Sequence, residues 1–176
     1  MKLAAVMPAL VLALGVALVL SGCATTTRLS AAPDVHALLI SIRDDDRQTF
    51  DAHVDRKALE AQLQARLVDK TRQTDMADGW KVLGLALSGP AARLAGNLLI
   101  QPDVFRAVAE YYGYRPETPI PNSFLVTGAL KALPDGRVCA TRRHDDRCLM
   151  TFANEGGIWR LVGFDGDAAL LRMKSR

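Results

Sequence analysis

The sequence predicts an α+β fold in which N-terminal helices pack on one face of a C-terminal four-stranded antiparallel meander. Before residue 113 the apolar residues recur with a helical period, and after residue 123 Gly-containing turns separate strand-like runs. A Pro-rich connector, "RPETPIPNS", lies between the two parts. We therefore expect a signal peptide at 1–22, a tether at 23–33 and a single domain at 34–176, helical over 34–113 and forming a sheet over 123–165.

The first segment has the pattern of an export signal. Lys2 provides a positive charge, and the run from Leu3 to Leu20 is uncharged and apolar. The following Leu20-Ser21-Gly22-Cys23 resembles the lipobox of bacterial lipoproteins, in which the cysteine thiol is acylated and the signal is cut before it. The resemblance implies a lipidated N-terminus at Cys23. An uncleaved transmembrane anchor is the alternative.

The residue after the cysteine bears on location within the cell envelope. Ala24 stands where the lipoprotein resemblance would place Asp for retention in the inner membrane. The resemblance therefore implies a periplasm-facing protein, with the outer membrane favoured over the inner one. The tether, "ATTTRLSAAP", would reach at most about 33 Å when extended.

The helical part divides into several expected elements. Pro33-Asp34 is a helix start, and the residues that follow include apolar positions at i, i+3, i+4 and i+7. Asp55 is an expected cap for a helix beginning at Arg56. The most apolar stretch, 79–101, predicts two buried helices, with an interfacial membrane helix as the alternative. The apolar stripe of the first helix is Val35, Leu38, Leu39 and Ile42; a short helix is expected over 47–54, and a last one from Pro102 to Gly113.

The strand pairing follows from the turn residues. A two-residue loop at Asp135-Gly136, a loop at 142–145 and a turn at Glu155-Gly156 place Cys139 directly opposite Cys148 and Phe152 opposite Trp159. The expected core face comprises Phe124, Val126, Leu130, Ala132, Cys139, Cys148, Met150, Phe152, Trp159 and Leu161. The expected outer face comprises Thr127, Lys131, Arg142, Arg147, Thr151 and Arg160.

Two cysteines remain once Cys23 is assigned to the anchor. Cys139 and Cys148 are an even pair in an oxidising compartment, so we predict a disulfide between them, with two buried thiols as the alternative.

The charge balance excludes a dedicated nucleic-acid binder. The chain carries +3, and without Lys2 the remainder is 3 − 1 = +2, with no concentrated basic excess. The cations of the outer face, Lys131, Arg142, Arg147 and Arg160, form a candidate binding face for an acidic envelope protein or anionic lipid. An ordinary solvated sheet face is the alternative.

No motif in the sequence points to an enzyme. His53 lies between Asp51 and Asp55, but a solvated helix terminus accounts for that cluster, and no catalytic residue, metal ligand or cofactor is predicted. We expect a lipid-anchored, non-enzymatic interaction or binding module at the membrane. The alternative is a small-ligand-binding or hydrolytic pocket between the helices and the sheet.

Three segments carry a family resemblance. "IRDDDRQTFDAHVDRKALEAQLQARL", "IQPDVFRAVAE" and "GGIWRLVGF" together resemble a family of bacterial envelope proteins known only as a domain of unknown function. The resemblance covers roughly residues 36–164 and implies no activity, cofactor or catalytic residue. A weaker likeness is to cystatin-like and nuclear-transport-factor-like domains, in which helices pack on a curved sheet.

Overall fold

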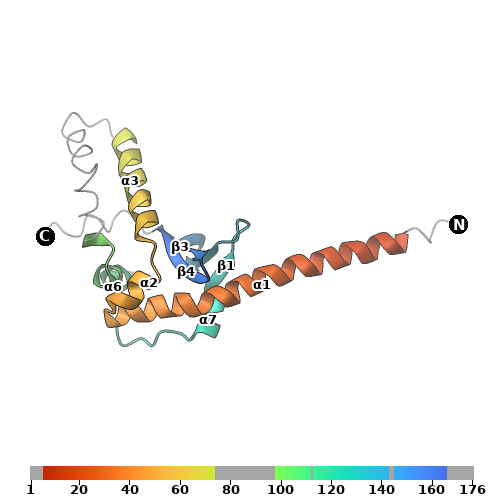
Figure 1. Cartoon of the computed structure of the whole chain (residues 1–176), viewed down its shortest axis with the longest axis horizontal. Helices are drawn as coiled ribbons and strands as arrows, with labels where there is room; N and C mark the ends of the chain where they lie inside the picture. Colours follow the sequence, from red (N-terminus) through yellow and green to blue (C-terminus); the bar gives the residue numbers. More distant parts are fainter. Residues whose placement is uncertain (1–5, 74–97, 112, 143–144, 166–176) are drawn as a thin grey trace.

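The computed structural model describes residues 6–73, 98–111, 113–142 and 145–165, and it confirms the α+β class (Figure 1). For residues 6–23, 67–73, 142, 145 and 146 the structure describes the backbone alone. The described helices are α1 (Val6–Asp44), α2 (Arg47–Ala52), α3 (Arg56–Gln73), α6 (Pro102–Tyr111) and α7 (Ser123–Ala129). The strands β1 (Leu130–Ala132), β2 (Val138–Arg142), β3 (Asp145–Glu155) and β4 (Ile158–Phe164) form a sheet in the order β1-β2-β3-β4, and neighbouring strands are antiparallel.

Helix α1 is longer than the sequence predicts. The structure has a continuous helix through 23–33, where we expected an extended tether, and Figure 1 shows its N-terminal part running well past the sheet. Ala31 and Ala32 are fully buried, so the apolar stripe begins before Pro33. Pro33 itself is exposed within the helix, where it has no N–H to bond the preceding turn. Burial of the apolar stripe therefore outweighs the preference of proline for the first turn of a helix.

None of the described helices contains a stretch that is both long enough and apolar enough to cross a bilayer.

Side-chain caps set the starts of the next two helices. Asp46 accepts a hydrogen bond from the Thr49 backbone N–H at 3.1 Å and begins α2. Asp55 accepts one from the Ala58 N–H at 3.0 Å, which confirms the predicted cap of α3. Most of the apolar stretch at 79–101 lies outside the described residues.

Helix α7 replaces the first half of the expected first strand. Asn122 accepts a hydrogen bond from the Leu125 N–H at 3.0 Å and caps the helix, so that strand structure begins only at Leu130. The assignment of Phe124 to the core face is therefore wrong, because its side chain is 76% exposed. Val126, on the opposite side of α7, is buried as expected.

The first hairpin differs from the prediction by one residue. Leu133 donates its N–H to the Arg137 carbonyl at 2.8 Å, and Gly136 has φ +82°, so the loop is Pro134-Asp135-Gly136 rather than two residues. A type I turn suits Pro134, and Gly136 takes the left-handed position that follows it. Ala132 consequently pairs with Val138 instead of Cys139. A one-residue shift moves Cys139 to the face opposite the core.

The last hairpin differs by two residues in its pairing, which leaves the faces unchanged. Gly156 and Gly157 both have positive φ, and they form a two-residue turn between Glu155 and Ile158. Phe152 pairs with Leu161 rather than Trp159, yet all three stay on the core side and are buried.

The hydrophobic core lies between α1 and the inner face of the sheet. The stripe of α1 packs with Phe50 of α2, Leu59 of α3 and the inward residues of the strands. Phe105 of α6 extends this core at the Phe50 side, in an edge-on contact with ring centroids 5.4 Å apart and planes at 66°. The buried apolar set is Ala31, Ala32, Val35, Leu38, Ile42, Phe50, Val54, Leu59, Ile100, Val126, Leu130, Val138, Phe152, Trp159 and Leu161.

Candidate functional site

The outer edge of β4 is closed by three separate parts of the helical region. The N–H of Trp159 donates to the Asp34 carboxylate of α1 at 2.8 Å. The N–H of Phe164 donates to the Gln62 side-chain carbonyl of α3 at 2.9 Å. Between them, residues 53–55 run parallel to the strand, with a bridge from Val54 to Leu161. This edge is therefore a structural junction between helices and sheet.

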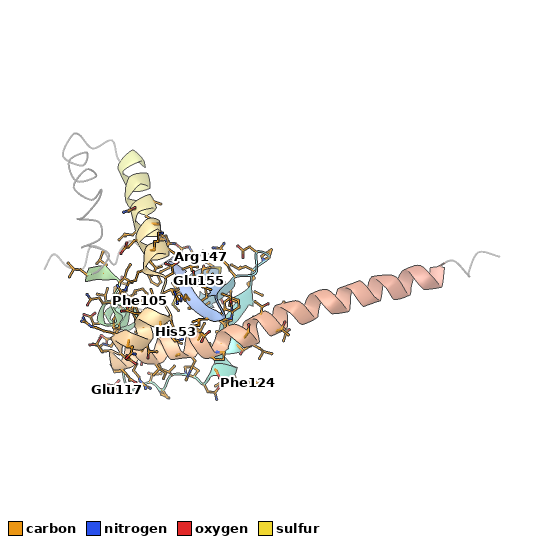
Figure 2. All side chains as sticks on the ribbon, viewed as in Figure 1. His53, Phe105, Glu117, Phe124, Arg147 and Glu155 are labelled. Carbon is orange, nitrogen blue, oxygen red and sulfur yellow. A yellow bond between two sulfur atoms is a disulfide. The ribbon has the colours of Figure 1, made fainter. Side chains whose placement is uncertain are left out.

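His53 belongs to this junction rather than to a catalytic cluster. Its Nδ1–H donates to the Thr49 carbonyl at 2.8 Å, which assigns the proton to that nitrogen, since a carbonyl oxygen only accepts. Its Nε2 lies 3.4 Å from Asp34 Oδ1. Figure 2 shows His53 beside α1, within the body of the protein.

The two aspartates beside His53 in the sequence have other partners. Asp51 forms an ion pair with Arg56 at 2.5 Å, and Asp55 caps α3. In the part of the chain that the structure describes, no group of three His, Cys, Asp or Glu side chains is arranged to hold a metal ion. The neighbourhood of His53 thus supplies hydrogen bonds and charge pairing to the fold.

The predicted cationic face is spread across the sheet. Lys131 and Arg160 share the outer face by register, but they lie on the first and last strands, which three inter-strand spacings separate by about 14 Å. Arg160 is half-buried and lies 3.6 Å from Glu155, while Lys131 and Arg147 are exposed. Arg142 lies at the end of β2, and its side chain is outside the described part. The structure therefore does not gather these cations into one compact site.

The predicted disulfide is present, with a different register. Cys139 and Cys148 are joined, with their Cα atoms 5.4 Å apart. They are not directly opposite, because Cys139 pairs with Thr151 and Cys148 pairs with Thr141, and β2 and β3 are irregular at this point. A bulge shifts the strands so that residues on neighbouring rows can be bridged. The bond links the two central strands on the face that carries Lys131 and Thr151, and Cys139 is fully buried there.

An exposed apolar pair on α7 is the surface feature that the sequence did not reveal. Phe124 is 76% exposed and its neighbour Leu125 is 62% exposed, and Figure 2 shows Phe124 on the far side of α1 from the sheet. We call these two residues the α7 pair. The sequence signal that could have predicted this pair is Asn122-Ser123, a typical helix start. A helix that begins there takes the place of the strand that we expected.

The predicted lipidation site lies N-terminal to this surface. Cys23 belongs to α1, and its side chain is outside the described part. Helix α7 packs on α1, and Val126 of α7 belongs to the same core cluster as Ala31 and Ala32 of α1. Among the positions of α1 whose side chains the structure describes, Ala31 is the first that is buried, and it follows Cys23 closely in the chain.

Comparison with known proteins leaves the family open. No family model, no curated protein and no solved structure matches the chain. The resemblances to the envelope family and to cystatin-like domains therefore remain predictions.

Proposed function

We propose that this protein is a lipid-anchored envelope protein that acts as a non-enzymatic interaction module at the membrane. The observation that carries the proposal is Leu20-Ser21-Gly22-Cys23 directly after an apolar run that follows a positive charge. Acyl chains on Cys23 attach a protein durably, because each buried methylene contributes about 0.8 kcal/mol. The periplasmic side of the outer membrane is the proposed location.

The non-enzymatic role is supported by how the polar side chains are used. Asp34 and Gln62 accept hydrogen bonds from the β4 edge, His53 bonds the Thr49 carbonyl, and Asp51 and Asp55 hold the adjacent helices. The sequence offers no catalytic motif to set against this structural use. Because these polar side chains serve the fold, we expect recognition to take place on the exposed surface.

Intact mass spectrometry of the protein extracted from bacterial membranes tests the anchor. The expected mass is that of a chain beginning at Cys23 with added acyl groups. The C23S variant should lose both the cleavage and the acylation, whereas T25S, which leaves the four-residue motif intact, should keep them. A native chain without acyl mass would contradict the proposal.

Native mass spectrometry in mild detergent tests the interaction role. A bound protein or anionic lipid is expected, and reversing the charges of Arg147 and Arg160 together should weaken an electrostatic complex, more strongly at low salt. A bound small molecule in place of both would instead favour a pocket between helices and sheet.

A further inference from the structure

We propose that the α7 pair, Phe124 and Leu125, contacts the lipid bilayer as a second attachment point beside the acylated Cys23. This inference rests on the proposed lipid anchor. Both side chains are large, apolar and mostly exposed on adjacent positions of one helix. An aromatic and a leucine side chain favour the boundary between headgroups and acyl chains, where they leave water.

The length of chain between the anchor and the folded domain identifies the bilayer as the occupant. Residues 24–30, none of which is buried, separate Cys23 from the fully buried Ala31. As a helix this spacer spans about 10 Å, and even fully extended it spans at most about 25 Å. A domain held this closely keeps its anchor-side surface within reach of the lipid.

Helix α7 lies on that anchor-side surface. It packs on α1, and its buried Val126 belongs to the same core cluster as Ala31 and Ala32. Figure 1 shows α7 beside α1 at the point where the long N-terminal part of α1 leaves the sheet. The pair is therefore carried by the element that packs on α1 immediately after the spacer.

The surrounding chemistry suits a lipid interface. The sequence of α7, SFLVTGA, contains no charged residue, so contact with lipid desolvates no ion. Ser123 and Thr127 provide polar groups at the same helix. On the spacer, Leu29 is 46% exposed and is a third large apolar side chain, between Cys23 and Ala31 in the sequence.

Depth-dependent quenching tests the contact directly. The acylated F124W variant is placed in phosphatidylcholine–phosphatidylglycerol vesicles whose acyl chains carry bromine, and the emission of the chain with native Phe124 is subtracted to remove Trp80 and Trp159. The matched control is I158W, because Ile158 is exposed at the β3–β4 turn, opposite Glu155, which Figure 2 shows across α1 from Phe124. The tryptophan introduced by F124W is expected to lose most of its emission, and the one introduced by I158W to keep it.

The outcomes separate this inference from the anchor itself. An acylated, vesicle-bound F124W chain whose introduced tryptophan is not quenched overturns the α7 contact and leaves the anchor standing. A chain that carries no acyl mass overturns both. Blue-shifted but unquenched emission from the F124W tryptophan, together with cross-linked dimers, would show that a second copy covers the pair, and would also overturn the bilayer contact.

Discussion

The two edges of the sheet are closed in different ways. β4 runs over Ile158–Phe164, and its outward N–H groups find acceptors on α1, on the segment 53–55 and on α3. β1 has only Leu130–Ala132, with the exposed Lys131 at its centre. An open edge is a template for pairing with another chain. A long edge is closed here by distant parts of the chain, whereas a short one is protected by its length and by a charge.

Removal of a core side chain on the closed edge should have the largest effect. L161A deletes a fully buried side chain whose backbone also bonds to residues 53 and 55, so the free energy of unfolding should fall by about 2–5 kcal/mol. I158A, on the exposed end of the same strand, should change it by less than about 0.5 kcal/mol. Urea denaturation measures both, and equal losses would remove the distinction between the closed part of β4 and its end.

Loss of the Asp34 carboxylate should have the next largest effect. D34A leaves the Trp159 N–H without its acceptor and removes the carboxylate that lies 3.4 Å from His53 Nε2, and we expect a loss of about 1–3 kcal/mol. D34N keeps a carbonyl oxygen for the N–H and should lose less. If D34A unfolds at the same denaturant concentration as the native chain, the hydrogen bond does not stabilise the edge.

The cap that leads into the edge segment should make stability depend on pH. Hydrogen bonds from the Thr49 hydroxyl and backbone N–H lower the pKa of Asp46, so the folded state favours its ionised form. This contribution is complete above the unfolded pKa, near 3.9, and is lost as the pH falls through the lower folded value. The difference in Tm between the native chain and D46A should therefore shrink below about pH 4. A difference that grows in acid would contradict this sign.

Substitution on the short edge should change stability least and association most. K131V removes the charge at the centre of β1, and we expect a change in the free energy of unfolding of less than about 0.5 kcal/mol. Light scattering should nevertheless rise faster with concentration, because an uncharged edge pairs more readily. K57V, at an exposed position of α3, is the matched control. Equal scattering by both variants would show that β1 needs no charge.

Local chemistry made the class of fold predictable. Asp55, the glycines of the turns and the apolar stripe of α1 act on nearby residues, and each produced the expected kind of element. The strand register was harder to predict, because the sequence Pro134-Asp135-Gly136 is compatible with a two-residue loop and with a three-residue loop. The resulting error moved Cys139 to the other face but left Phe152 and Leu161 correctly inside.

The β4 edge and the α7 pair were beyond sequence reasoning for a different reason. The bond from Trp159 to Asp34 joins residues that are 125 positions apart, and no local pattern pairs them. The exposure of Phe124 depends on one cap at Asn122, which competes with an alternating pattern that equally suits a strand. Both features depend on tertiary contacts, which local secondary-structure propensity does not determine.

The bond between α1 and β4 has a consequence for the order of folding. The first helix of the domain is completed by its last strand, so the stripe of α1 has no partner on the β4 side until Trp159 and Leu161 have been synthesised. Contacts of such long sequence separation delay folding, because the loop between them must close before they are made. A chain truncated before residue 158 lacks this closure. We therefore expect the domain to fold as one unit, after β4 has been synthesised.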